Sequence, residues 1–331
     1  MRPMVYLQSL RYVLRRLAQA VPTIIVIAII NFCVLQLAPG DAADVLAGES
    51  GGATPEYMQQ IRESYGLDKP IPVQLVLYVK NVLSLDLGYS FRNSAPVRDL
   101  ILQRLGPTLL LMGVTIVLSI CLGALLGIFA SSRVNTWRDN AISVLSLVSY
   151  ATPLFWAGLM FISVFSLWLG WFPTGGMEAI TEFNEGWDRV FDILHHLFLP
   201  ALTLSLFHMA VYTRLMRSAM LEQRGMDYVT TARAKGLTEG RINMSHMVRN
   251  AILPVVTMAG VQVSTLFGGS IVVETVFGWP GMGLLAFQAL FARDLNLLLG
   301  IFLISACLVV FINMVVDVLY FVLDPRIRDA G

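Results

Sequence analysis

The ionisable residues best placed to do chemistry in this 331-residue chain lie in or beside long apolar segments. Asp317 falls within an apolar run, where a carboxylate needs a partner or water. Arg214, near the end of another run, is a candidate partner, and we expect a structural ion pair rather than a proton relay. His195 and His196 are adjacent, so on a helix their side chains point about 100° apart. This arrangement disfavours a shared metal ion.

Motifs that bind nucleotides or metal ions are missing from the sequence. No G-x-x-x-x-G-K-[ST] loop occurs, because none of the three lysines is followed by Ser or Thr. Neither H-E-x-x-H nor a Cys/His cluster is present. We therefore predict no catalytic residues, no metal site and no cofactor on this chain. The net charge of +1 also gives no footprint for nucleic acid.

The most informative pattern of local structure lies in a short polar segment, residues 227–236, between two apolar runs. Asp227 is suited to be the N-cap residue of a helix, and Gly236 is suited to follow its end, with Lys235 in the last turn. A helix of about two turns is not stable alone in water and must dock on a surface. Ala232 and Gly236 lie four apart on one face with almost no side chain. That face could receive a partner's backbone or pack on its own protein, and the residues alone leave both open.

The surrounding elements are predicted to be membrane spans. The chain is 56% hydrophobic and 14% charged, whereas soluble domains carry about 25% charged residues. We predict an all-α integral membrane protein, because six apolar stretches are long enough to cross a bilayer. They cover residues 12–38, 106–131, 141–170, 194–216, 251–274 and 296–322. The third is expected to be one helix kinked at Pro153, with Trp168 and Trp171 at the membrane interface.

The charges indicate which side of the membrane each loop occupies. Most of the 23 lysines and arginines lie on the side of the two termini, so both termini are predicted to be cytoplasmic. Residues 217–250 are then a cytoplasmic loop, and residues 41–104 form an external cap. Turn and capping residues predict a small helical cap, with helices at about 54–65 and 73–85.

Several residues inside the spans have two candidate roles. Trp156, Gln262 and Ser264 are candidates to line a pore, but each could equally face lipid or a neighbouring helix. Gly123 and Gly127 form a small-xxx-small pair, which is typical of close helix packing.

The cytoplasmic segment resembles the EAA loop of ABC-importer permeases, whose pattern is E-A-A-x-x-x-G followed by I-x-L-P. Thr230, Thr231 and Ala232 stand at the E-A-A positions, Gly236 is the glycine and Pro254 is the proline. A narrower resemblance, to the B-type permeases of the oligopeptide/dipeptide/nickel subfamily, extends almost from end to end. It is carried by A-P-G-D at 38–41, Y-G-L-D-K-P at 65–70, L-D-L-G-Y-S at 85–90, T-A-R-A-K-G-L at 231–237, R-N-A-I-L-P-V-V-T at 249–257, E-T-V-F-G-W-P-G-M-G at 274–283 and D-P-R-I-R at 324–328.

This resemblance implies a type I importer fold in a bacterial inner membrane. It implies a heterodimer with a second homologous permease, two cytosolic ATPase subunits that bind ATP and Mg, and an external solute-binding protein. It also implies that the loop couples the ATPases to the pore. The coupling residues carried over are Asp227, Tyr228, Thr231, Ala232, Arg233, Ala234, Lys235, Gly236 and Leu237.

Two other classes of protein remain as alternatives. A secondary transporter driven by an ion gradient would favour paired intramembrane acids and an inverted repeat, whereas the sequence holds one deep acid and no repeat. A channel or scaffold would need no energy-coupling loop. The sequence leaves the solute open among dipeptides, longer peptides, glutathione-like molecules, nickel chelates and opine-type compounds.

Overall fold

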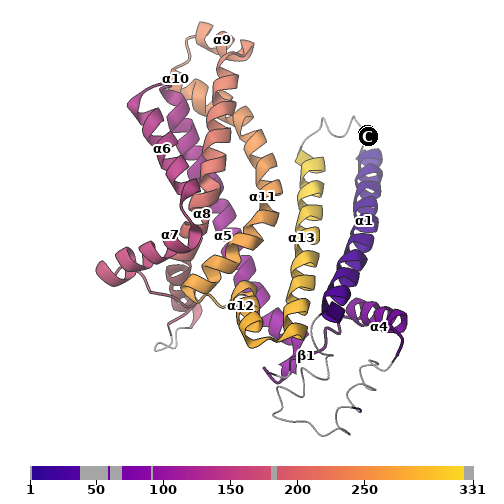
Figure 1. Ribbon diagram of the computed structural model, residues 1–331. Helices are drawn as coiled ribbons and strands as arrows, with labels where there is room; N and C mark the ends of the chain where they lie inside the picture. The colour runs from indigo at the N-terminus through magenta and orange to yellow at the C-terminus, as the bar shows by residue number, and fades with distance from the viewer. Residues whose placement is uncertain (1, 38–58, 60–68, 91, 180–184, 324–331) are drawn as a thin grey trace. The chain divides into compact units, whose positions relative to one another are not determined.

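The computed structural model describes the chain except for residues 1, 38–58, 60–68, 91, 180–184 and 324–331. Long helices dominate the described chain, as the composition predicted (Figure 1). The chain divides into two compact units. One comprises Met1–Gly106 with Leu285–Gly331, and the other comprises Pro107–Leu284.

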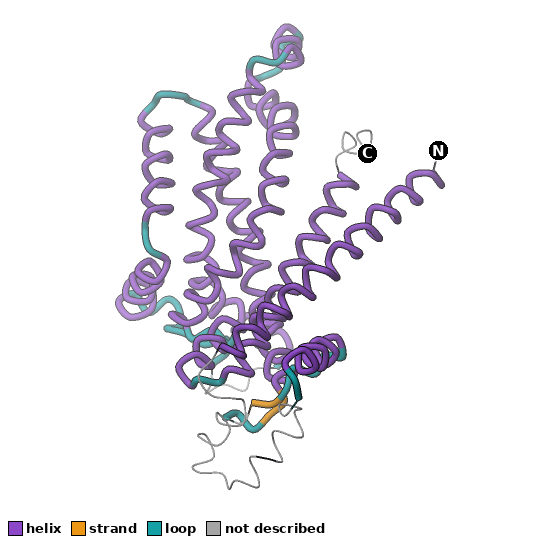
Figure 2. Tube along the Cα trace, turned by 45° about the vertical axis from the view of Figure 1, so that its right-hand side comes forward, coloured by secondary structure: helices purple, strands orange, loops and turns teal. Residues whose placement is uncertain are grey.

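The unit Pro107–Leu284 is a helical bundle built around α8 (Gly186–Arg224). The helices α5 (Val97–Ser132), α6 (Trp137–Ala151) and α11 (Val248–Phe277) run beside it in both views (Figures 1 and 2). A Cβ atom at Gly123 would lie 2.5 Å from the Cβ of Tyr212, and one at Gly127 would lie 2.6 Å from that of Met216. The predicted role of the two glycines in close packing is therefore confirmed.

We predicted a single helix over residues 141–170 as the third span, and this prediction is wrong. The segment consists of α6 and a second helical stretch, α7 (Leu154–Phe161) continuing as the π-helical η1 (Ile162–Trp168), and the two stretches meet at 106°. Pro153 lies at the break and Thr152 before it is extended, with ψ 127°. Proline has no N–H to donate and disfavours helical geometry in the preceding residue, so it ended the helix rather than kinking it.

At the end of α8 the chain forms three short helical segments (Figure 1). These are α9 (Asp227–Ala234), α10 (Glu239–Arg241) and the π-helical η2 (Ile242–Met247), which leads into α11. Thr238 stands at the N-cap position of α10. The segment therefore folds as compact helical turns against the bundle.

In the other unit, α1 (Arg2–Leu37) packs against α13 (Leu295–Leu323). Asn31 on α1 donates its side-chain N–H to the carbonyl of Leu299, 3.2 Å away. The helix α4 (Ile71–Leu83) packs against α1, and Val82 is buried with Ala28 and Leu303. This small core joins three segments that are far apart in the sequence.

The segment that we predicted to form an external cap differs in part from that prediction. The expected helix at 73–85 is confirmed as α4, and the one at 54–65 falls almost wholly outside the described residues. A two-stranded hairpin, β1 (Tyr89–Ser90) paired with β2 (Ala95–Pro96), was not predicted (Figure 2). The cap is thus not purely helical, and it ends before 104 because α5 already begins at Val97.

Three helices in the described chain are long and apolar enough to cross a membrane, or up to five if each bent pair forms one span. The three are Val97–Ser132, Gly186–Arg224 and Leu295–Val316. The bent pairs are the α6–η1 stretch and Glu239–Val263 with Thr265–Phe277, which meet at 63°. The described helices α1, α5, α8, α11 and α13 contain five of the six predicted spans almost entirely.

Candidate functional site

The predicted loop helix exists as α9, but it begins one residue earlier than expected. Met226 is the N-cap residue, and Asp227 is the first helical residue rather than the cap. The Met226 carbonyl accepts the N–H of Val229 at 3.0 Å. Asp227 still contributes at this position, because a carboxylate in the first turn is favourable beside the positive end of a helix.

The end of α9 is a Schellman motif, as the glycine predicted. Gly236 has φ +75°, and its N–H donates to the carbonyl of Arg233 at 2.9 Å. The N–H of Leu237 donates to the carbonyl of Ala232 at 3.3 Å, which completes the motif. Nothing lies within 4 Å of the position that a Cβ at Gly236 would occupy. The left-handed backbone alone therefore favours glycine here.

One face of α9 is buried against its own protein. Val229 is fully buried and Ala232 is 6% exposed. They belong to an apolar cluster whose other buried members are Tyr212, Met216, Ala219, Met220, Ile242, Met247, Ala251, Val255 and Ala259. Of the two roles that the sequence left open for this face, Ala232 has the second, packing on its own protein. Because the cluster includes side chains of α8, η2 and α11, α9 is mechanically joined to two long helices of the bundle.

The outward face of α9 carries mostly short side chains. Thr230, Thr231 and Ala234 are exposed, as are Lys235 and Gly236. Tyr228 is half-buried, and its hydroxyl donates to the side-chain oxygen of Gln223 at 2.6 Å. Short side chains leave the helix backbone within reach of another protein.

An exposed ion pair connects α9 to α10. Arg233 donates from Nε to Oε1 of Glu239 at 2.7 Å and from a terminal nitrogen to Oε2 at 3.3 Å. The hydrogen bonds from Arg233 hold the pKa of the Glu239 carboxyl below its usual range. This pairing orients Arg233 toward α10, so its guanidinium is already engaged within the loop.

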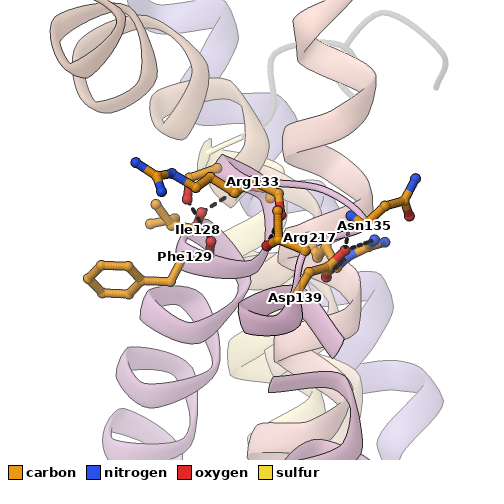
Figure 3. A network of polar contacts seen from close by, with 9 residues as sticks. Ile128, Phe129, Arg133, Asn135, Asp139 and Arg217 are labelled. Carbon is orange, nitrogen blue, oxygen red and sulfur yellow. Dashed lines mark hydrogen bonds and ion pairs between the residues drawn. The ribbon is translucent and has the colours of Figure 1, made fainter. Parts of the chain in front are cut away.

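A second ion pair, which sequence analysis missed, fastens α8 to α6 near the same end of the bundle (Figure 3). Nε and a terminal nitrogen of Arg217 each donate to a carboxylate oxygen of Asp139 at 2.7 Å. Asp139 also accepts the backbone N–H of Asn135 at 3.0 Å, and its side chain is 3% exposed. Arg224, farther along α8, donates to the carbonyl of Ser132. The turn between α5 and α6 is therefore held to the helix that leads directly to α9.

The candidate pore residues do not form a described cluster. Trp156 is 50% exposed on α7. Gln262 is half-buried and accepts the Thr265 hydroxyl at 2.8 Å within its own helix. The side chain of Ser264 lies outside the described residues. Pore lining by these three residues stays a prediction.

The predicted pair of Asp317 and Arg214 also stays a prediction, because the side chain of Asp317 is not among those described. Arg214 is exposed, and its guanidinium lies over the Tyr150 ring, 5.4 Å from the centroid. His195 and His196 bond in different directions, to the carbonyls of Trp171 and Asp192 respectively. In the described part of the chain, no group of three or more metal-ligating side chains occurs.

The segment 274–283 contains a buried polar centre whose geometry the sequence did not reveal. The Glu274 carboxylate accepts the Thr108 hydroxyl at 2.8 Å and the N–H groups of Gly283 and Leu284 at 2.6 and 3.1 Å. The Thr108 oxygen accepts the N–H of Met282 at 2.8 Å. These bonds satisfy the first N–H groups of α12 (Met282–Ala292), which have no partner within the helix. Glu274 and Thr108 therefore have a structural role.

Comparison with protein families matches the two parts of the chain to two descriptions. Residues 123–329 match the family described as "Binding-protein-dependent transport system inner membrane component". Residues 9–112 match the N-terminal region described for membrane components of the same kind of system.

Curated relatives cover nearly the whole chain. The oligopeptide transport system permease protein AppB of Bacillus subtilis is 41% identical over 319 residues, covering 96% of this chain and 99% of the relative. The dipeptide transport system permease protein DppB of Escherichia coli is 37% identical over 336 residues, with the same coverage of both chains. Among solved structures, a chain of the inward-facing MetNI methionine ABC transporter matches with a TM-score of 0.52 and 18% identity, covering 66% of this chain and 93% of that chain. The last match concerns the fold alone.

Proposed function

The chain belongs to the family of binding-protein-dependent transport system inner membrane components, and from that premise we propose that it moves peptides inward through coupling at α9. As a member of that family it is the pore-forming subunit of an ATP-driven importer. The proposal adds a substrate class, an orientation and a contact surface. In it, both termini and α9 lie in the cytoplasm, two ATPase subunits serve the complex, and a second permease completes the pore.

The observation that carries the coupling proposal is the two-sided packing of α9. Its inner face, Val229 and Ala232, belongs to one apolar cluster with side chains of α8 and α11. Its outer face, Thr230, Thr231 and Ala234, presents short exposed side chains to solvent. A displacement imposed on the outer face would pass to α8 and α11, because packed interiors transmit strain. We assign the ATPase contact to this outer face, with Ala232 as its internal support.

The ion pair of Asp139 with Arg217 extends the same path. Arg217 lies on α8 two turns before the start of the loop, and its bidentate bond ties α8 to α6. A bidentate Arg–carboxylate pair fixes direction as well as distance. In the proposed mechanism, α6 therefore moves with α8 when the ATPases act on α9.

Support for peptides as the substrate class comes from the relatives. Both AppB and DppB are named for peptide transport, and each is covered over 99% of its length. Most basic residues lie on the side of the termini, which supports a cytoplasmic α9. An external binding protein would deliver the peptide from the opposite side.

The coupling proposal is tested by adding bulk or charge to the outer face of α9. In the full complex reconstituted in liposomes, we expect Ala234→Glu and Gly236→Trp to keep membrane insertion but to lose ATPase co-purification or peptide-stimulated ATP hydrolysis. Ala234→Glu would bury an unpaired charge on docking, and Gly236→Trp would hold the two surfaces apart.

Asn140→Glu provides the matched control, because Asn140 is an exposed residue in the first turn of α6 and away from α9. It adds the same charge and should leave uptake and ATP hydrolysis unchanged. Normal peptide uptake by both α9 variants, with the complex intact, would remove the outer face of α9 from the mechanism.

A further inference from the structure

A small open cleft lies within the unit formed by residues 1–106 and 285–331. Its volume is about 400 Å³, and it is lined mainly by Arg92, Asn93, Leu285, Phe287, Gln288 and Phe291. Arg92 and Asn93 come from the turn of the β1–β2 hairpin, and the others come from α12. A volume near the lower end of the range of ligand pockets suits a ligand group the size of one or two amino-acid residues.

The polar wall of the cleft is held by a buried network. The Ser90 hydroxyl donates to the carboxylate of Asp294, whose other oxygen accepts the N–H of Leu297 at 3.0 Å. The Ser90 oxygen accepts the backbone and side-chain N–H groups of Asn93 at 3.2 and 2.9 Å. Ser90 is fully buried and Asp294 is 5% exposed. The hairpin turn that contains Arg92 is therefore held in place against the start of α13.

The charges in the cleft are not balanced within the described chain. Asp294 is engaged by Ser90 and Leu297, and no described acidic side chain forms a salt bridge with Arg92. Phe287 and Phe291 line the same cleft with ring centroids 4.7 Å apart, and they are 41% and 73% exposed. A cleft lined by a guanidinium and by exposed aromatic rings is complementary to a ligand that joins a carboxylate to an apolar group.

From this arrangement we infer that the cleft binds the C-terminal residue of the transported peptide, with its carboxylate on Arg92 and its side chain against Phe287 and Phe291. The inference rests on the proposed function, because the orientation proposed there places the hairpin on the outer side, where peptide arrives. One cation suits a single carboxylate, and the remaining lining is amide and apolar. The cleft thus supplies a subsite for free C termini that carry an apolar side chain.

The test is a double-mutant cycle between the protein cation and the peptide carboxylate. Uptake of a peptide with a C-terminal Leu, and of the same peptide with a C-terminal amide, is measured for wild type and Arg92→Gln at saturating binding protein. We expect Arg92→Gln to raise the KM for the free-acid peptide about tenfold and to leave the KM for the amide nearly unchanged. Any preference of the binding protein for one peptide over the other cancels, because it is the same for wild type and for Arg92→Gln.

Two matched controls, Arg98→Gln and Leu290→Ala, distinguish the cleft from its surroundings. Arg98→Gln removes a cation that is paired with Asp99 and lies outside the cleft, so the KM should not change. Phe287→Ala should raise the KM for a peptide ending in Leu more than for one ending in Gly, whereas Leu290→Ala, exposed on α12 but not lining the cleft, should not. If the C-terminal amide raises the KM relative to the free acid by the same factor in Arg92→Gln as in wild type, the cleft is not the carboxylate site. Failure of wild type to take up any peptide would instead overturn the proposed function.

Discussion

Two helices of the Pro107–Leu284 unit end in the same backbone motif, but one motif is open to solvent and the other leads into the interior. Gly236 follows the end of α9 and Gly278 follows the end of α11, and both glycines are left-handed, with φ +75° and +59°. In each, the glycine N–H donates to the carbonyl three residues earlier, and the next N–H donates to the carbonyl five residues before it. The residue after the glycine differs, since Leu237 is half-buried while Trp279 is fully buried.

The residues beyond each glycine explain the contrast. After Gly278 the chain folds over Glu274, whose carboxylate crowds any Cβ that could be placed at Gly281 or Gly283. Around Gly236 a Cβ would meet nothing within 4 Å. The same cap therefore closes an interior turn at one end of the bundle and presents an open surface at the other. Stability and exposure are determined by what packs around the motif and not by the motif itself.

The largest expected effect is at the closed turn. Glu274→Ala would leave the Thr108 hydroxyl and the N–H groups of Gly283 and Leu284 without their acceptor. Because buried unsatisfied donors cost about 1–3 kcal/mol each, we expect loss of folded protein or a fall in melting temperature of more than about 10 °C. Thermal unfolding of the detergent-purified complex measures this fall.

Two further variants make this first test specific to the closed turn. Glu274→Gln keeps an acceptor for the N–H groups and should be milder than Glu274→Ala. Glu239→Ala removes an exposed acid beside the open cap and should change the melting temperature by less than a few degrees, because exposed ion pairs contribute about 0–1 kcal/mol. Similar losses at positions 274 and 239 would abolish the contrast between the two turns.

An intermediate effect is expected at the pair of Asp139 and Arg217, because one partner is buried and the other is partly exposed. The Asp139 side chain is 3% exposed and that of Arg217 is 29% exposed. Arg217→Ala would leave the carboxylate with only the N–H of Asn135, at a cost of about 1–3 kcal/mol. We expect a lower melting temperature and, if α6 follows α8, less uptake per ATP hydrolysed.

The double variant Asp139→Ala with Arg217→Ala tests whether the two residues act together. It should recover part of the stability lost in Arg217→Ala, because the buried charge is removed as well. Strictly additive losses in melting temperature would show that the pair contributes no coupling between α6 and α8.

The sequence predicted those features that depend on local chemistry. Hydrophobic run length located the helices, and Gly236 was identified because a left-handed helix end favours glycine. The break at Pro153 was underestimated, since whether a proline kinks or ends a helix depends on the packing around it. The surroundings of Ala232 stay open in the sequence, because it does not show which side of a two-turn helix meets its own protein.

Long-range polar pairs could not be predicted from the sequence. Asp139 and Arg217 are 78 positions apart, and Thr108 and Glu274 are 166 apart. Neither pair has a spacing that sets it apart from other charged or polar residues. One hint was available, since Asp139 lies in the first turn of α6 and just outside the apolar core of its span. Its partner became evident only once α6 and α8 were seen side by side.

The smallest effect on stability, and the sharpest test of the open cap, is at Gly236. Alanine there adds little bulk but is strained at φ +75° by about 1 kcal/mol, whereas asparagine tolerates that backbone better and is larger. Gly236→Ala should therefore lower the melting temperature more than Gly236→Asn does. If the open space is where the ATPase approaches, peptide-stimulated ATP hydrolysis should fall more in Gly236→Asn than in Gly236→Ala. The two measurements should rank the variants in opposite orders, because strain acts on the fold and bulk acts on the docked surface. The same order in both would mean that Gly236 only terminates α9, as Gly278 terminates α11.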